Sequence, residues 1–208
     1  MKLIQRTLLI LFTLVILVNQ ANAQDKKTIL FFGNSLTAGL GVTPQQSFPG
    51  IIQQKLKASD YDYQVVNAGL SGETTAGGLG RIDWILKNNH IDIFVLELGA
   101  NDGLRGLDVS QTESNLSGII KKVRDKYPDV TILLAGMQMP PNLGKTYADQ
   151  FQQTFKNVAK KENVKLIPFL LEGVGGNPKY NQSDGIHPNV EGHKILAENV
   201  WKVLKEVI

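Results

Sequence analysis

Residues 29–41 read ILFFGNSLTAGLG, an apolar run that ends abruptly at a glycine, an asparagine and a serine. The apolar residues at its start do not alternate with polar ones. Such a run is typical of a strand that is buried on both faces, as in a parallel sheet covered by helices. The strand could end in an ordinary turn, or it could deliver Ser35 to a cleft as a nucleophile.

Four further apolar runs follow along the chain, and they too are continuous. They lie at residues 65–66, 93–96, 132–135 and 166–167. Apolar residues recur with helical spacing between the runs, as at Leu116, Ile119 and Val123. The alternation of strands and helices predicts an α/β fold with a doubly wound sheet. We find no repeat or linker, so residues 24–208 are expected to form a single domain.

Residues 1–23 have the pattern of a secretory signal peptide. Lys2 and Arg6 precede an apolar core at residues 8–18, and the small residues of Ala21-Asn22-Ala23 are typical of a signal peptidase site. The apolar core is shorter than the roughly 20 residues that a membrane-spanning helix needs. We therefore predict cleavage after Ala23, a periplasmic or secreted bacterial protein, and no stable membrane anchor after cleavage.

Composition argues against several kinds of partner and site. Removal of residues 1–23 takes away two basic residues and no acidic one, so the formal charge falls from +3 to +1. This near balance, without a basic run, argues against nucleic acid as a partner. The chain has no cysteine and therefore no disulfide. Its three histidines lack the spacing of zinc ligands, so we expect no metal site.

Polar residues follow four of the five apolar runs. In an open parallel sheet, ligands bind beyond the carboxyl ends of the strands, and these ends share one edge of the sheet. The residues that we expect at this edge are Asn34 and Ser35 after the first run, Asn67 and Gly69 after the second, Asn101 and Asp102 after the third, and Asp184 and His187 beyond the fifth.

Together these residues can hydrolyse an ester, which requires a nucleophile, a base, a group that orients the base, and donors for the oxyanion. Ser35 can be the nucleophile, His187 the base, and Asp184 the group that fixes the imidazole tautomer. The Asn101 side chain and the backbone N–H groups of Gly69 and Ser35 can form the oxyanion hole. Each residue alone more often serves a turn or a cap, and only their convergence on one edge favours catalysis.

Four segments resemble the sequence blocks of the SGNH (GDSL) hydrolases. In chain order they are FFGNSLTAG, NAGLSGETT, ELGANDGLRG and DGIHPN. The third block and GIHPN are most similar to the bacterial thioesterase I, lysophospholipase and arylesterase branch. The resemblance implies a three-layer, flavodoxin-like sandwich with a five-stranded parallel sheet, and neither a metal nor another cofactor. It also implies the same triad, Ser35, Asp184 and His187, and the same oxyanion hole, Ser35, Gly69 and Asn101.

Asn34 departs from the family pattern, which usually has an aspartate before the serine. No role assigned above requires a carboxylate at this position, because Asp184 already supplies the acid of the triad. We expect Asn34 to serve the shape of the turn more than a charge.

Glu97 ends the third apolar run. A carboxylate inside an apolar strand must be paired or protonated. The sequence allows a structural hydrogen bond to Asn101 or to the loop of the neighbouring strand, and it also allows a part in catalysis.

The loop at residues 136–144 reads GMQMPPNLG and bears on the substrate. Its methionines, prolines and leucine could form an apolar wall, since methionine adapts to varied shapes. The candidate lining residues of an acyl groove are Leu104, Met139, Pro140 and Leu143, together with Leu107. A core role for these residues is equally compatible with the sequence.

We predict an exported, monomeric serine esterase that acts through an acyl-serine intermediate. Its expected substrates are small acyl esters or thioesters, including lysophospholipids and aryl esters. Two alternatives stay open. One is a carbohydrate O-acetylesterase, which would need a smaller and more polar pocket, and the other is a non-catalytic ligand-binding module on the same fold.

Overall fold

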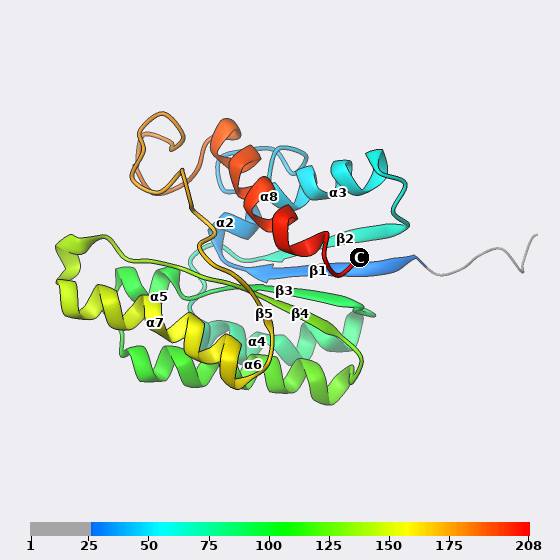
Figure 1. Cartoon of the computed structure of the whole chain (residues 1–208), viewed down its shortest axis with the longest axis horizontal. Coiled ribbons are helices and arrows are strands. Elements are labelled where there is room, and N and C mark those ends of the chain that lie inside the picture. Colours follow the sequence, from blue (N-terminus) through cyan, green and yellow to red (C-terminus); the bar gives the residue numbers. More distant parts are fainter. Residues whose placement is uncertain (1–25) are drawn as a thin grey trace, which may run out of the picture.

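A five-stranded parallel sheet lies at the centre of the computed structural model, which describes residues 26–208 (Figure 1). Its strands are β1 (Lys27–Gly33), β2 (Tyr63–Gly69), β3 (Ile93–Glu97), β4 (Thr131–Ala135) and β5 (Lys165–Ile167). They lie in the order β2-β1-β3-β4-β5, and every neighbouring pair is parallel. The predicted five-stranded sheet is therefore confirmed. The predicted signal peptide at residues 1–23 lies outside the described residues.

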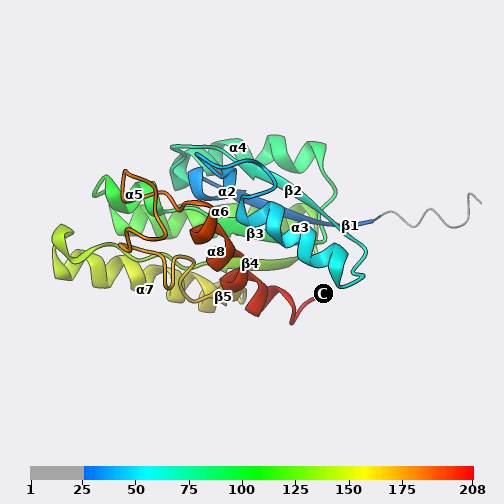
Figure 2. The same cartoon turned by 90° about the horizontal axis from the view of Figure 1, so that it is seen from above.

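Helices cover both faces of the sheet, which gives the three layers that we predicted (Figures 1 and 2). One layer holds α3 (Phe48–Ala58) and α8 (Val190–Leu204). The other layer holds α4 (Thr75–Asn88), α6 (Val109–Lys126) and α7 (Lys145–Lys161). Three short helices complete the fold: α2 (Ser35–Ala38), α5 (Ala100–Leu104) and the 3₁₀ helix η1 (Pro141–Leu143).

Burial follows the position of each strand in the sheet. All of β3, and all of β1 after Lys27, is buried, because these strands have a neighbour on each side and helices on each face. The edge strands β2 and β5 are only partly buried. Phe31 of β1 packs edge to face on Phe48 of α3, with ring centroids 5.5 Å apart. The apolar runs at residues 29–32 and 93–96 thus lie at the centre of the core, as the pattern indicated, whereas those at residues 65–66 and 166–167 lie in the partly buried edge strands.

The strand register brings three chain segments together where the strands end, at the carboxyl-terminal side of the sheet. Gly33, the last residue of β1, pairs with Gly69 of β2 on one side and with Glu97 of β3 on the other. The loops that follow these strands therefore leave the sheet next to one another. A fourth segment, residues 168–189 between β5 and α8, carries Asp184 and His187.

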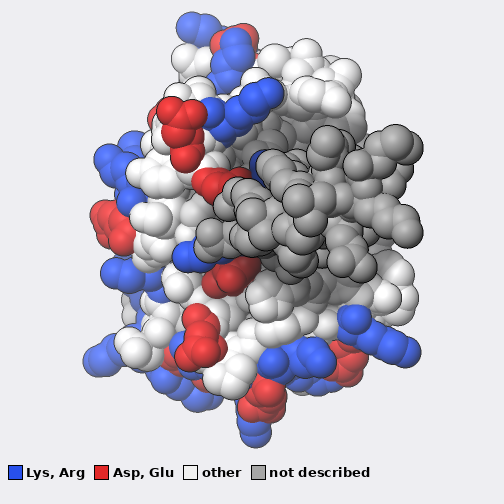
Figure 3. All heavy atoms as spheres, turned by 90° about the vertical axis from the view of Figure 1, so that its right-hand side faces the viewer, with Lys and Arg blue, Asp and Glu red and all other residues white. Residues whose placement is uncertain are grey.

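Figure 3 shows the side of the molecule on which β1 begins, with basic and acidic side chains interspersed over the face that is not grey. Several surface ion pairs join opposite charges, for example Lys122 with Asp83 at 2.6 Å and Lys55 with Glu198 at 2.6 Å. This mixture agrees with the near balance of charge in the sequence. Within residues 26–208, no helix is both long and apolar enough to cross a membrane.

Candidate active site

Ser35 is held at the end of β1 by a short helix. It is the first residue of α2, and Asn34 caps this helix by accepting a hydrogen bond on Oδ1 from the N–H of Leu36 at 2.9 Å. The Ser35 side chain is nearly buried, and its Oγ lies 2.9 Å from Nε2 of His187. The two residues are 152 positions apart in the chain, so the fold brings them together as predicted.

Asp184 completes the row of three side chains. Its Oδ2 lies 2.7 Å from Nδ1 of His187, and its Oδ1 accepts the N–H groups of Ile186 at 2.9 Å and His187 at 3.0 Å. The hydrogen bond from the His187 ring and those from the two backbone N–H groups lower the pKa of Asp184 to about 2. The carboxylate is therefore ionised at neutral pH and can stabilise an imidazolium at His187.

A pocket of about 550 Å³ opens beside Ser35 and His187. Its wall is mostly apolar, and Leu104, Met139 and Pro140 belong to it, as predicted. Leu143, which was also predicted, does not line this pocket; it lies in η1 and is partly exposed. Met137, one of the two methionines of the predicted wall, also lines the pocket, whereas sequence reasoning missed Leu36, Phe169, Leu171 and Ile186.

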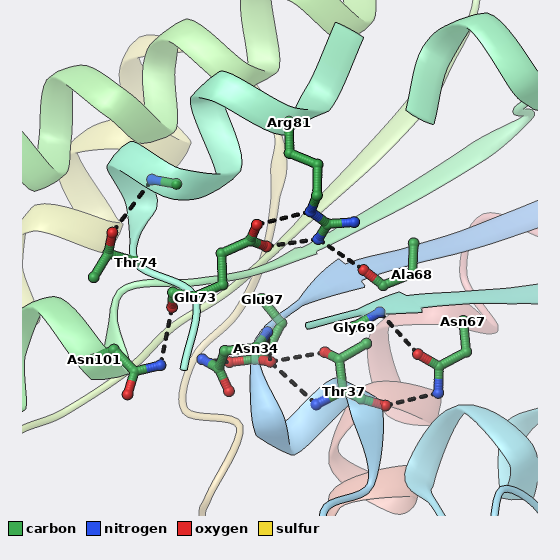
Figure 4. Close-up of polar contacts among 11 residues, drawn as sticks. Asn34, Thr37, Asn67, Ala68, Gly69, Glu73, Thr74, Arg81, Glu97 and Asn101 are labelled. Atoms are coloured by element: carbon green, nitrogen blue, oxygen red, sulfur yellow. Dashed lines mark hydrogen bonds and ion pairs between the residues drawn. The ribbon is translucent and has the colours of Figure 1, made fainter. Parts of the chain in front are cut away.

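Asn101 lies in α5 and also lines the pocket. Its Nδ2 donates to the carbonyl oxygen of Glu73 at 2.9 Å, which orients the amide and leaves its second N–H free for a ligand (Figure 4). The Glu73 carboxylate is in turn held by Arg81 through bonds of 2.7 Å and 2.6 Å. Arg81 also donates to the carbonyl of Ala68 at 2.9 Å, so it ties the end of β2 to the loop behind Asn101.

Gly69 does not have the free N–H that we expected of it. This group donates to Oδ1 of Asn67 at 3.0 Å, and the Asn67 amide in turn donates to the carbonyl of Thr37 at 2.8 Å (Figure 4). A Cβ at Gly69 would lie 2.2 Å from the backbone nitrogen of Ala38. Gly69 is thus needed for the close approach of β2 to α2, and its N–H already has a partner.

Gly72, in the loop that follows, has the properties expected of a donor. Its φ of +81° suits glycine, and among the described residues its N–H donates no hydrogen bond. The next residue is Glu73, whose carbonyl orients Asn101. Both glycines occur in the segment NAGLSGETT, and the sequence has no signal that separates a packing glycine from a donor.

Glu97 is completely buried and contacts the loop of the neighbouring strand, one of the two hydrogen-bonding options that the sequence allowed. Its partners are Asn34 and Thr37, on either side of Ser35 (Figure 4). Burial raises the pKa of Glu97 to about 7, while hydrogen bonds from Thr37 and Asn34 act in the opposite direction.

The GDSL-like Lipase/Acylhydrolase family model matches residues 31–195, a range that holds all the residues of this site. The chain belongs to this family. The predicted serine hydrolase that acts on ester bonds is thereby confirmed, as is the predicted family.

Relatives and solved structures agree with this assignment to the GDSL-like acylhydrolases. Esterase TesA of Pseudomonas aeruginosa is 43% identical over 195 residues, which cover 94% of each chain. Thioesterase 1/protease 1/lysophospholipase L1 of Escherichia coli K12 is 35% identical, over 94% of this chain and 90% of that protein. The psychrotrophic esterase EstA from Pseudoalteromonas sp., in a structure inhibited by monoethylphosphonate, is 30% identical with a TM-score of 0.81, over 86% of this chain and 97% of EstA.

Proposed function

We propose that this acylhydrolase cleaves acyl esters and thioesters with Ser35 as nucleophile, His187 as general base and Asp184 as the residue that orients the base. One observation carries the proposal: the continuous row of short contacts from Asp184 through His187 to Ser35, at the mouth of an apolar pocket. The similar esterase EstA has a structure inhibited by monoethylphosphonate, and inhibition by a phosphonate agrees with a nucleophilic hydroxyl.

The reaction proceeds in two halves. Ser35 Oγ attacks the carbonyl carbon while its proton moves to Nε2 of His187, and a tetrahedral oxyanion forms. Collapse of this intermediate breaks the ester bond, and the alcohol or thiol leaves with the proton from His187. The acyl group remains on Ser35 until His187 takes a proton from water, which attacks in the same way and releases the carboxylic acid.

Three N–H groups are proposed to stabilise the oxyanion. They are the backbone N–H of Ser35, the free N–H of the Asn101 side chain, and the backbone N–H of Gly72 in place of Gly69. Ser35 begins α2, so its N–H has no partner within the helix. The bond from Asn101 to Glu73 supports the assignment of Gly72, because it holds the loop of Gly72 against Asn101.

Asn101→Ala should lower kcat by about 10²- to 10³-fold, because it removes one donor that acts on the developing charge. KM should change little, since the ground-state carbonyl carries less charge than the oxyanion. Steady-state kinetics with a short p-nitrophenyl ester would measure both constants. Asn88→Ala, at the exposed end of α4, is the control, and an equal loss there would contradict the role of Asn101.

The apolar wall favours substrates with an acyl chain over acetylated carbohydrates. An O-acetylesterase would need a small polar pocket, whereas the wall of this pocket is mostly apolar and includes leucine, methionine and phenylalanine side chains. A non-catalytic binding module would have no need of the aligned triad. Hydrolysis rates for p-nitrophenyl esters from acetate to decanoate, with an acetylated glycan alongside, test the proposal. Preference for the longer esters supports it, and cleavage of the glycan alone would contradict it.

Leu104→Ser should lower kcat/KM for decanoate about tenfold more than for acetate, because it removes apolar surface from the wall of the pocket. Leu107→Ser is the matched control. The two leucines are similarly exposed, at 42% and 41%, but only Leu104 lines the pocket. Equal losses for both esters in the Leu104 variant would place the acyl chain elsewhere.

Export is part of the proposal. Residues 1–23 would direct the chain out of the cytoplasm, and residues 24–208 would remain as a monomeric enzyme after cleavage. Support comes from the basic start, the apolar core and the small residues before Gln24. Mass spectrometry of the protein recovered from a periplasmic extract should find Gln24 at the N-terminus.

A further inference from the structure

Glu97 occupies an unusual place for an acidic residue. It ends β3, pairs in register with Gly33 of β1, and has no exposed surface. Asn34 and Ser35 directly follow Gly33 in the chain, and the Glu97 carboxylate contacts the turn that presents the proposed nucleophile, at Asn34 and Thr37. An ionised group buried here is costly unless donors surround it.

Four donors from this turn converge on the two oxygens of Glu97. Oε1 accepts from Nδ2 of Asn34 at 2.8 Å. Oε2 accepts from the N–H of Asn34 at 3.1 Å, the N–H of Thr37 at 3.3 Å and the hydroxyl of Thr37 at 2.7 Å. The donors stand one position before and two positions after Ser35, so the carboxylate fixes both ends of the segment that carries Ser35 (Figure 4).

The approach of this turn to Glu97 is close enough to exclude any side chain at Gly33. A Cβ there would lie 2.2 Å from Oγ1 of Thr37 and 2.5 Å from Oε2 of Glu97. Asn34 is also fixed at its other end, because its Oδ1 accepts from Leu36 at 2.9 Å while its Nδ2 donates to Glu97. The amide therefore cannot turn over without losing one of these bonds.

We propose that Glu97 and Asn34 form one positioning unit, in which a buried carboxylate accepts from the Asn34 amide and holds the Ser35 turn in its reactive geometry. Glu97 acts through the turn and touches neither substrate nor the reacting atoms. The proposal rests on the role of Ser35 proposed above. It also gives Asn34 a task beyond the shape of the turn, since an aspartate here would place two carboxyl groups against each other.

Reversing the direction of one hydrogen bond tests this unit. In Glu97→Gln, one of the two carboxylate oxygens becomes an NH2 group. In either orientation of the new amide, this NH2 group faces an N–H donor of the turn, and that donor loses its acceptor. In Asn34→Asp, two carboxyl groups face each other and must share a proton. The double variant Asn34→Asp/Glu97→Gln restores a donor and an acceptor, because the introduced amide nitrogen at position 97 donates to the introduced carboxylate at position 34, while its oxygen still accepts from Thr37.

We expect Glu97→Gln to lower kcat for p-nitrophenyl acetate by about tenfold or more at pH 8, with KM nearly unchanged, because an unmatched buried pair disturbs the turn. Asn34→Asp should lower kcat by up to about tenfold, since the family usually has aspartate here and two facing carboxyl groups can share a proton. The double variant should return kcat to within about threefold of wild type, since the pair is matched again. A double variant whose loss equals the product of the two single losses would overturn the proposal, as would a fully active Glu97→Gln. If Glu97→Gln does not fold, a double variant no more active than Asn34→Asp overturns it.

Asp92→Asn is the matched control. Asp92 joins the same two strands at their opposite end, where its Oδ2 accepts from the N–H of Thr28 in β1 at 2.7 Å. Its replacement should leave kcat unchanged, whatever its effect on the melting temperature. Labelling of wild type at Ser35 by a fluorophosphonate separates the two proposals. If Ser35 is not labelled, the proposed function fails. If Ser35 is labelled but the losses of the two single variants multiply in the double variant, only the proposed role of Glu97 fails.

Discussion

Ser35→Ala should lower kcat for ester hydrolysis on the order of 10⁶-fold, as removal of the nucleophile does in serine hydrolases. The side chain that remains cannot form the acyl intermediate, while the pocket and the oxyanion donors are unchanged. KM, where it can still be measured, should therefore stay within a few-fold of wild type. The measurement is steady-state hydrolysis of a p-nitrophenyl ester of medium length, at high enzyme concentration for the variant.

Ser59→Ala, at the exposed end of α3, is the control for this change and should keep full activity. A fluorophosphonate probe should add to Ser35 of wild type, and peptide mass spectrometry should find the adduct on that residue. An adduct on another serine, or normal turnover in Ser35→Ala, is incompatible with the proposed nucleophile.

Asp184→Asn should lower kcat on the order of 10⁴-fold, by analogy with the loss of the triad acid in other serine hydrolases. The carboxylate accepts from Nδ1 of His187 at 2.7 Å and so directs the lone pair of Nε2 toward Ser35. An amide at position 184 can present its N–H to Nδ1 and favour the opposite tautomer, in which Nε2 carries the proton and cannot act as base.

The pH profile provides a second readout for Asp184. Its pKa is held at about 2, so the carboxylate is ionised over the whole working range, and wild-type activity should not follow the titration of Asp184.

The control for Asp184→Asn is Asp83→Asn, which removes an exposed carboxylate of α4 that pairs with Lys122 of α6. A loss below about tenfold in Asp184→Asn would mean that another group orients His187.

The amino-acid sequence by itself determined the architecture and the chemical groups of the site. Continuous apolar runs such as residues 29–32 and 93–96 are stable only between two helical layers, and their alternation with helical segments leads to a parallel sheet. Because parallel strands end at a common edge, the residues after these runs meet there. This physical rule was enough to bring Ser35 and His187 together across 152 positions of chain.

Only the tertiary structure decided which neighbours these groups have. Gly69 and Gly72 look alike in the sequence, but the side chain of Asn67 occupies the N–H of Gly69. Leu104 and Leu107 are equally apolar and equally exposed, yet only the first reaches the pocket. Glu97 finds its donors more than 60 positions earlier in the chain, at Asn34. Hydrophobic periodicity records which face of an element is buried, whereas hydrogen-bond partners and pocket walls depend on how distant segments are placed against one another.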